Sequence, residues 1–350
     1  MDFGTNKILV SGANGWLGKT LIDCLLNGVK NSKDLQKSDK SLKIKCLVLN
    51  GENTTFLKEL SKNISTFNGD ITNEEDCKLF TEDSKDAILF HCAGIIHPNR
   101  TNQFFEINVK GTNNVLKYAA ENGVKKVVVV SSNSPCGTNP NNSHRFDESS
   151  KYNPYMKYGH SKMMMEKLVH EYFRDGKLET VIVRPPWFYG PYQPSRQIKF
   201  YKMIKDGKVP IIGDGENFRS MACTINISQG LIRSAIMPKT SGNTYWIADK
   251  DPYTFNEIIK TVREVFKNEF NIISKNSVIK LPNILSSLAY QLDRVIQLTN
   301  FYNKEIHVLS EMNKTIACSI KKAENELGYK PTVDLYEGTK LSIQSALSEF

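Results

Sequence analysis

A tyrosine and a lysine whose spacing suits proton transfer stand near the middle of the chain, at Tyr158 and Lys162. The surrounding segment, 153–173, has a helical pattern, and side chains four residues apart lie on one face of a helix. A free phenol titrates near pH ~10, and a neighbouring ammonium is expected to lower its pKa. Such a pair could act as general acid and base. Because the same spacing is common on solvated helix faces, the surrounding elements must decide between the two interpretations.

A glycine-rich turn follows the first apolar segment, 7–11. It reads Gly12-Ala13-Asn14-Gly15-Trp16-Leu17-Gly18, and a helical pattern begins near Trp16. Glycines allow unusual backbone dihedrals, a close approach of the backbone to a pyrophosphate and tight packing of the helix on its strand. The free N–H groups at the start of the helix can then bind the phosphates. The sequence therefore predicts a dinucleotide-binding turn.

Apolar segments alternate with helical patterns through the first half of the chain. Strands are predicted at 7–11, 44–49, 64–67, 87–91, 125–132 and 180–184. Residues 127–130 are all valine, which is typical of a strand buried on both faces of a parallel sheet. Strict alternation of strands and helices with short turns predicts an α/β fold with a doubly wound parallel sheet.

Polar and small residues follow these strands, at the edge where such sheets bind ligands. Asn50 stands where an acid usually binds the ribose hydroxyls of NAD, so NAD and NADP are not distinguished. Asp70 either contacts the adenine or caps the helix that begins near Asn73. The small residues at 92–94 would let a cofactor lie across the strand end. Ser132 ends the fifth strand and is expected to face the same crevice as the glycine-rich turn.

The composition is that of an ordinary globular enzyme. With 350 residues, the chain can hold one large α/β domain or a domain with a smaller companion. The net charge of +9 is spread along the chain, so we expect a modest bias toward phosphate-bearing ligands and no nucleic-acid partner. The seven scattered cysteines indicate neither a disulfide framework nor a metal site, and favour a cytoplasmic protein. No apolar segment approaches the ~20 residues that span a bilayer.

The order and spacing of the glycine-rich turn, Ser132, Tyr158 and Lys162 resemble the extended short-chain dehydrogenase/reductase family, in its NAD-dependent epimerase/dehydratase group. The resemblance continues over most of the chain, through the segments 108–112, 184–191, 213–219 and 323–331. It implies a Rossmann-like nucleotide domain, a smaller and mostly helical C-terminal substrate lobe, and NAD or NADP as the cofactor. Members of the family often form homodimers through a pair of helices, which makes a homodimer an expectation here.

The resemblance also implies hydride transfer at a secondary alcohol or ketone. Tyr158 would be the general acid or base, Lys162 would bind the nicotinamide ribose and lower the pKa of the phenol, Ser132 would orient the substrate oxygen, and Asn108 would support the lysine. The implied cofactor-binding residues are Gly12, Asn14, Gly15, Trp16, Leu17, Gly18, Asn50, Asp70, Ile71, Cys92, Ala93, Gly94, Tyr158, Lys162 and Pro185. The implied substrate-binding residues are Ser132, Asn133, Tyr158 and Arg219.

The chain also departs from the family pattern. Asn133 and Ser134 stand where dehydratases carry Asp-Glu, which argues against 4,6-dehydration. The residues at 135–136 and Asn226 resemble the 3β-hydroxysteroid dehydrogenase branch, whereas Arg219 resembles the arginine that meets the substrate diphosphate in nucleotide-sugar members. We therefore expect an NAD(P)-dependent oxidoreductase or epimerase for a nucleotide-activated sugar. The alternatives are a net dehydrogenase or ketone reductase for a steroid-like or other apolar alcohol, and an inactive dinucleotide-sensing regulator.

Two lobes are expected. Residues 1–186, with 224–248 returning to them, would form the nucleotide domain, and residues 187–223 and 249–350 the substrate-binding lobe. Within the latter, 281–300 has the pattern of an amphipathic helix. The apolar side of that helix is formed by Ile284, Leu285, Leu288, Ala289, Leu292, Val295 and Ile296. This side is expected to pack onto the protein's own core, and the alternatives are a lid, a partner helix or a membrane-surface contact.

Overall fold

A seven-stranded parallel sheet forms the centre of the protein, whose computed structural model describes residues 1–37 and 41–350. In spatial order its strands are β11 (Thr244–Trp246), β6 (Thr180–Arg184), β5 (Lys126–Val130), β4 (Ile88–His91), β1 (Lys7–Ser11), β2 (Lys43–Val48) and β3 (Ile64–Asn68). The chain order reverses between β1 and β4, so the carboxyl ends of these two strands border a crevice of the kind that binds ligands in α/β proteins.

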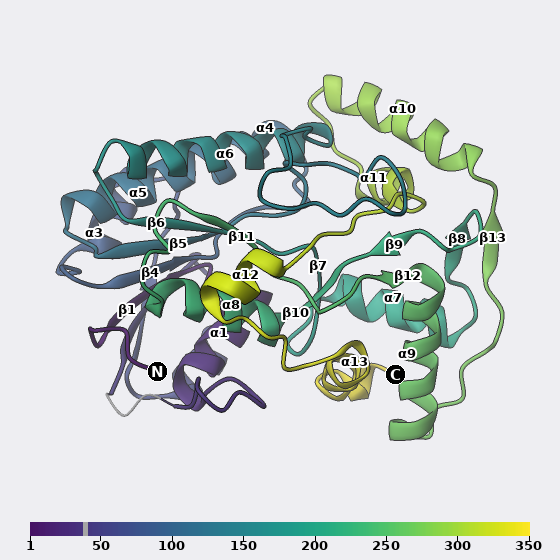
Figure 1. The fold of residues 1–350 in the computed structure, drawn as a ribbon, viewed down its shortest axis with the longest axis horizontal. Coiled ribbons are helices and arrows are strands. Elements are labelled where there is room, and N and C mark those ends of the chain that lie inside the picture. The colour runs from purple at the N-terminus through teal and green to yellow at the C-terminus, as the bar shows by residue number, and fades with distance from the viewer. Residues whose placement is uncertain (38–40) are drawn as a thin grey trace.

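Helices cover both faces of the sheet (Figure 1). Because side chains alternate along a strand, Ile8 and Val10 of β1 face one layer and Leu9 faces the other. The first layer contains α1 (Trp16–Asn27), α2 (Thr55–Leu60), α8 (Thr224–Ile236) and α12 (Lys321–Leu327). The second contains α3 (Glu74–Thr81), α5 (Thr112–Glu121) and α6 (Met156–Arg174). The predicted doubly wound α/β fold is confirmed.

The helix predicted at 102–122 is not uniform. It consists of α4 (Asn102–Phe105), a π-helical segment (Glu106–Gly111) and α5. Asn108 lies in the π-helical segment. Single π-helical turns are frequent at functional sites.

The remaining elements form a smaller assembly, on the right in Figure 1. It contains β7 (Trp187–Tyr189), α7 (Ser195–Lys205), β8 (Pro210–Ile212), β9 (Phe218–Arg219), β10 (Met221–Cys223), β12 (Tyr253–Thr254), α9 (Phe255–Phe270), β13 (Ile279–Leu281), α10 (Ile284–Leu298), α11 (Lys304–Glu311), α13 (Leu335–Gln344) and a final 3₁₀ turn (Leu347–Glu349). The strands pair two by two, as β7 with β10, β8 with β13 and β9 with β12. A separate apolar cluster joins α7, α9 and the C-terminal residues. The C-terminal helical region is therefore present, as predicted.

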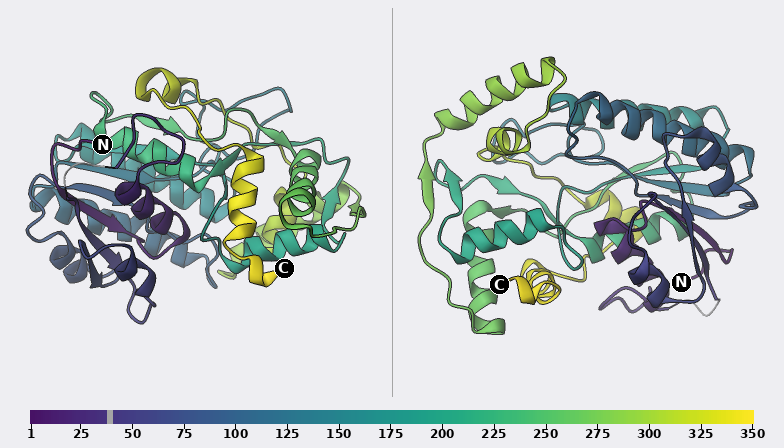
Figure 2. Two further views of the ribbon diagram at one scale, coloured as in Figure 1. Left: turned by 90° about the horizontal axis from the view of Figure 1, so that it is seen from below. Right: turned by 180° about the vertical axis from the view of Figure 1, so that it is seen from behind.

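The amphipathic helix predicted at 281–300 is α10, but its orientation is the reverse of the one expected. Of the residues predicted to face the core, Ala289 is buried and Leu285 and Ile296 are partly buried. Ile284, Leu288, Leu292 and Val295 are all exposed, so the prediction is wrong for the greater part of this side. Figures 1 and 2 show α10 at the edge of the molecule, outside α11. Within the described residues, no helix has both the length and the apolar character needed to cross a bilayer.

Candidate functional site

The glycine-rich turn lies between β1 and α1, beside the end of β4. Gly12 has a φ of 69°, and a Cβ at this position would lie 2.7 Å from the backbone nitrogen of Ala93. A Cβ on Gly18 would lie 2.2 Å from the carbonyl oxygen of Gly12. Gly12 therefore lets the turn approach β4, and Gly18 lets α1 pack on the turn, as the spacing of the glycines predicted.

The remaining part of the turn is open and fits a dinucleotide. Gly15 is exposed and immediately precedes α1, so the N–H groups of the first helical turn are available to a phosphate. The Oδ1 atom of Asn14 is buried and has no hydrogen-bond partner among the described residues. A buried acceptor normally has a partner, and a ribose hydroxyl has the donor that it lacks. Trp16 and Leu17 fit the site only through their backbone, since Trp16 Nε1 donates to the Pro191 carbonyl at 2.7 Å and Leu17 is buried in the core.

The ends of β2 and β3 provide fewer side chains for cofactor binding than expected. Asn50 is exposed, just beyond β2. Asp70 Oδ1 accepts hydrogen bonds from the Thr72 nitrogen at 2.8 Å and the Thr72 hydroxyl at 2.9 Å. Helix α3 is capped by Asn73 itself, so Asp70 is not the helix cap that was one of its two expected roles. The side chain of Ile71 is buried against Gly111, which leaves only its backbone to the cofactor.

The end of β4 lies between the glycine-rich turn and Lys162. The Cys92 nitrogen donates to the Ser11 carbonyl at 3.1 Å, and Gly94 is exposed. A Cβ on Gly94 would lie 3.1 Å from Asn108 Oδ1 and 3.4 Å from Lys162 Nζ. The backbone of Cys92, Ala93 and Gly94 therefore passes close to Lys162, which the small size of these residues allows.

Asn108 holds this backbone segment in place. Its Oδ1 accepts from the Ile95 nitrogen at 2.9 Å, and its Nδ2 donates to the Ile95 carbonyl and to the Ser161 hydroxyl, both at 3.1 Å. Ser161 immediately precedes Lys162 on α6. Asn108 thus joins the end of β4 to α6, at the residue next to Lys162.

Ser132 lies on the turn that follows β5. Its hydroxyl is 3.2 Å from the Ser134 hydroxyl, accepts from the Ser134 nitrogen at 3.2 Å and donates to Asn133 Oδ1 at 3.4 Å. A Cβ on Gly159 would lie 2.5 Å from the Ser134 carbonyl oxygen. The glycine next to Tyr158 therefore allows the turn to contact α6, which brings Ser132 to the tyrosine.

Tyr158 is partly buried near the start of α6, with its ring centroid 5.6 Å from that of Phe104. Burial raises the pKa of its phenol to about 12, the Ser132 hydroxyl lowers it, the Glu311 carboxylate raises it and the Arg196 guanidinium lowers it. The prediction that the pKa of Tyr158 is lowered is therefore wrong for the protein alone, because burial dominates. An uncharged phenol is the form that can donate a proton to a substrate oxygen.

Lys162 is buried, four residues further along α6. Its Nζ donates to the Val130 carbonyl at the end of β5, at 3.1 Å. Burial lowers the pKa of this ammonium to about 8, while the Glu166 carboxylate acts in the opposite direction. The amine is thus held at the carboxyl ends of β4 and β5, where a dinucleotide in the crevice would place its nicotinamide half.

The smaller lobe adds a buried cation. The guanidinium of Arg219 donates to the Glu311 carbonyl at 2.5 Å and lies 5.9 Å from the centre of the Trp187 ring. Its Nε has no hydrogen-bond partner among the described residues, and burial lowers the pKa of the group. Arg219 is therefore a buried charge with an unused donor, as an anion-binding arginine would be.

Pro185, one of the expected cofactor-binding residues, is buried directly after β6.

Arg196 and the pair His97–Tyr302 also surround Tyr158, and the sequence did not single them out for this site. The Arg196 guanidinium lies 5.9 Å from the Trp16 ring and lowers the pKa of Tyr158. His97 Nδ1 is 2.9 Å from the Tyr302 hydroxyl, and Tyr302 and Tyr158 both contact the ring of Phe104. These residues come from separate parts of the chain, so no local spacing could have indicated them.

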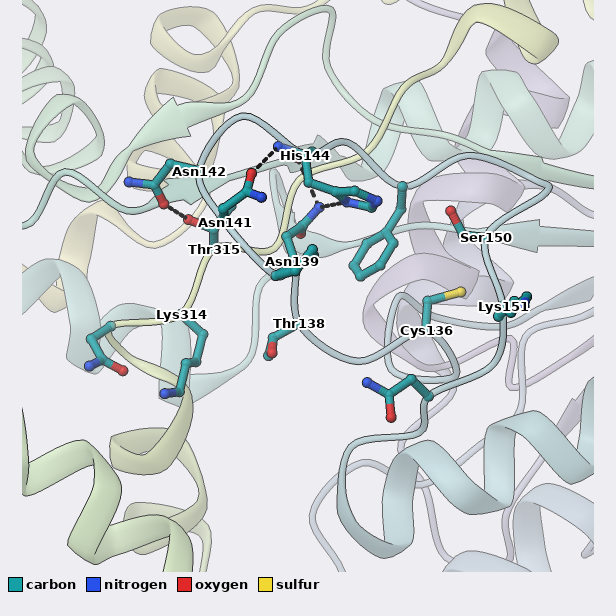
Figure 3. Close-up of a pocket in the computed structure, with 14 residues that line it drawn as sticks. Cys136, Thr138, Asn139, Asn141, Asn142, His144, Ser150, Lys151, Lys314 and Thr315 are labelled. Atoms are coloured by element: carbon teal, nitrogen blue, oxygen red, sulfur yellow. Dashed lines mark hydrogen bonds between the residues drawn. The ribbon is translucent and has the colours of Figure 1, made fainter.

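A pocket borders the segment that follows Ser132, with lining residues between Cys136 and Asn153. It has a volume of about 680 Å³ and polar walls, which include Asn139, Asn142, Lys151 and Lys314 (Figure 3). Neither Tyr158 nor Lys162 lines it. Within residues 1–37 and 41–350, no cluster of three His, Cys, Asp or Glu side chains is placed to hold a metal ion.

Known proteins are similar to this chain in sequence. The model of the NAD dependent epimerase/dehydratase family matches residues 8–224. An uncharacterized protein, y4nL, from Sinorhizobium fredii is 44% identical over 337 residues, which cover 96% of this chain and 94% of that protein. The Escherichia coli O157:H7 N-acetyl-α-D-glucosaminyl-diphospho-ditrans,octacis-undecaprenol 4-epimerase is 25% identical over 262 residues, which cover 74% of this chain and 72% of that protein.

The fold is also found in solved structures. The dTDP-glucose 4,6-dehydratase DesIV of Streptomyces venezuelae, solved with NAD and TYD bound, has a TM-score of 0.75 and 22% identity. The match covers 98% of this chain and 97% of that chain.

Proposed function

Because the chain belongs to the NAD dependent epimerase/dehydratase family, we propose that it is an NAD-dependent oxidoreductase or epimerase that acts at a secondary alcohol of a nucleotide-activated sugar. The observation that carries this proposal is the convergence of Ser132, Tyr158 and Lys162 beside a turn that fits a dinucleotide. A regulator that only binds a dinucleotide has no need of these three groups.

Each residue of the site would have a separate role. NAD, when bound, supplies the hydride acceptor. Tyr158 would accept the proton of the substrate hydroxyl as hydride leaves the carbinol carbon, and it would return a proton when the ketone is reduced. Ser132, which hydrogen-bonds the phenol, would orient the same substrate oxygen. Lys162 anchors the nicotinamide ribose from the ends of β4 and β5, and Asn108 keeps that edge aligned with α6. Together these residues would hold the reacting carbon of the substrate beside the cofactor.

Elimination of water fits this site poorly. Residues 133 and 134, next to Ser132, are an asparagine and a serine, whose side chains hydrogen-bond within the turn. Neither can act as a carboxylate acid or base. The site therefore supports redox chemistry at the carbinol carbon over 4,6-dehydration.

Arg219 supports a substrate activated through a diphosphate. It is buried, its Nε has no partner among the described residues, and it contacts Glu311, whose carboxylate acts on the pKa of Tyr158. A buried guanidinium is well suited to bind phosphate oxygens with two parallel hydrogen bonds. A steroid-like alcohol would leave this charge without an anion.

We expect Arg219→Gln to raise the KM for a nucleotide sugar by about 10- to 100-fold, because hydrogen bonds to charged groups contribute ~1.5–3 kcal/mol. The kcat should change much less, since the diphosphate is remote from the reacting carbon. Steady-state kinetics on the full chain measures both constants. Arg174→Gln, an exposed arginine at the end of α6, is the matched control and should leave KM unchanged. An unchanged KM in Arg219→Gln would remove the diphosphate from the proposal.

The experiment that tests the reaction type follows the nicotinamide absorbance of the purified protein during turnover of UDP- and dTDP-hexoses. An epimerase should keep its cofactor, form the epimer and show no net absorbance change. A net dehydrogenase or ketone reductase, the alternative function, should show a stoichiometric change. Native mass spectrometry of the same preparation identifies any retained NAD or NADP. Retention of NADP, or failure of every diphosphate sugar to react, would contradict the proposed function.

A further inference from the structure

The outward face of α10 is unusual because the polar side of this helix is the buried one. Ser286, Asp293 and Gln297 point into the protein and are all satisfied there. Ser286 donates to the Ser310 carbonyl at 2.8 Å, and Asp293 contacts His307 at 2.7 Å. These polar contacts determine which side of α10 faces the protein.

The opposite side of α10 carries a stripe of large apolar residues. It consists of Ile284, Leu288, Leu292, Val295 and Leu298, and Phe301 extends it beyond the helix. The exposed fractions in this set range from 50% for Leu292 to 75% for Leu298. Burying polar groups while exposing this many apolar ones is costly in water, and exposed patches of this kind mark contact surfaces.

The charges around the stripe are mostly positive. Arg294 is the exposed charged residue of α10, and Asp293, its neighbour, is buried against His307. Lys280 precedes the helix, and Arg100 forms a backbone bridge to Phe301. Glu305, at the start of α11, is an exposed acid in the same region. A second copy would bring the same positive charges to the interface, whereas an anionic surface would complement them.

The stripe lies on the outside of the elements that border the catalytic tyrosine. The nitrogen of Lys157, next to Tyr158, donates to Gln297 Oε1 of α10 at 3.0 Å. Tyr302, in the connection from α10 to α11, packs on Phe104, which also contacts Tyr158. A surface bound to α10 would therefore lie close to the elements that carry Tyr158.

We propose that the outward face of α10, together with Phe301, docks on the surface of an anionic lipid bilayer. The stripe would enter the headgroup region while Arg294, Lys280 and Arg100 meet lipid phosphates, as in helices that lie in the plane of a membrane. The docked protein would hold α6, which carries Tyr158, close to the bilayer. The docking itself is independent of the reaction proposed above.

The test is sedimentation of the full chain with phosphatidylcholine vesicles that contain about one-third phosphatidylglycerol. We expect the protein to sediment with these vesicles, and Leu288→Gln/Leu292→Gln to bind at least about tenfold more weakly. Arg294→Glu should weaken binding to the same vesicles and have little effect with pure phosphatidylcholine, because it removes only the charge contribution.

The matched control is Leu79→Gln/Leu347→Gln, which removes two exposed leucines far from α10 in sequence, in α3 and in the final 3₁₀ turn. It should bind vesicles like the unmodified chain. The proposal is overturned if the unmodified chain stays in the supernatant or if the α10 variant binds equally well. It is also overturned if light scattering without lipid shows a dimer that the α10 variant alone dissociates, because a second copy would then cover the stripe.

Discussion

Replacing Tyr158 by phenylalanine should lower kcat by about 10²- to 10⁴-fold, the usual contribution of a positioned general acid or base. The substitution removes only the hydroxyl and keeps the ring that packs on Phe104, so folding and cofactor binding should be preserved. The measurement is kcat for an identified substrate, together with the affinity for NAD from titration calorimetry. A fall in both would indicate a damaged crevice instead of a lost proton-transfer group.

Tyr155→Phe is the matched control, three residues earlier at the start of α6. Its hydroxyl is 2.7 Å from the Ser310 hydroxyl, so this variant loses one partly buried hydrogen bond and about 1 kcal/mol of stability. Its kcat should stay within a few-fold of the unmodified value. If Tyr158→Phe kept full turnover, or if Tyr155→Phe lost as much, Tyr158 would not be the catalytic residue.

The second large effect concerns stability. We expect Glu166→Ala to lower the free energy of unfolding by about 3–5 kcal/mol, because it leaves a buried arginine without its counter-charge. Glu166 and Arg184 form a buried ion pair with an Nη2–Oε2 distance of 2.6 Å, and the Ser131 hydroxyl donates to the same carboxylate at 2.6 Å. Arg184 also lies 5.5 Å from the centre of the Trp246 ring, so the pair connects α6 to β6 and β11. Urea denaturation of the full chain measures the loss.

Two further variants separate the buried charge from other causes. Glu349→Gln breaks an exposed pair with Lys202, 2.9 Å long, and should cost less than about 1 kcal/mol. The double variant Glu166→Leu/Arg184→Met removes both charges and should recover much of the stability lost in Glu166→Ala, since no unpaired ion remains. If the double variant were no more stable than the single one, packing and not charge would explain the effect.

Local sequence predicted the fold well, for reasons that are themselves local. Alternating strands and helices, the valines of β5 and the glycines at 12 and 18 depend on the backbone and on burial over a few residues. The position of Tyr158 and Lys162 on one helix also follows from spacing alone. The family resemblance added the roles of Ser132 and Asn108, whose partners lie 2 and 53 residues away respectively.

Three properties depended on contacts that no short segment contains. The pKa of Tyr158 is set by burial and by Arg196 and Glu311, which the smaller lobe brings to it. Asp70 is not the cap of α3, because Asn73 accepts the first free N–H groups of the helix while Asp70 accepts from Thr72. Arg219 is recognisable as a candidate anion site only when its unused Nε can be seen in a buried position.

Helix α10 shows most clearly which properties follow from the sequence and which depend on the tertiary structure. Its sequence determined that one side is apolar and the other polar, since that follows from the helical period. Which side faces inward was decided by tertiary structure, because His307, Ser310 and the backbone of Lys157 provide partners for the polar side. A buried polar side chain is stable only when such partners are in place, and partners that distant in the chain are assembled only by the fold.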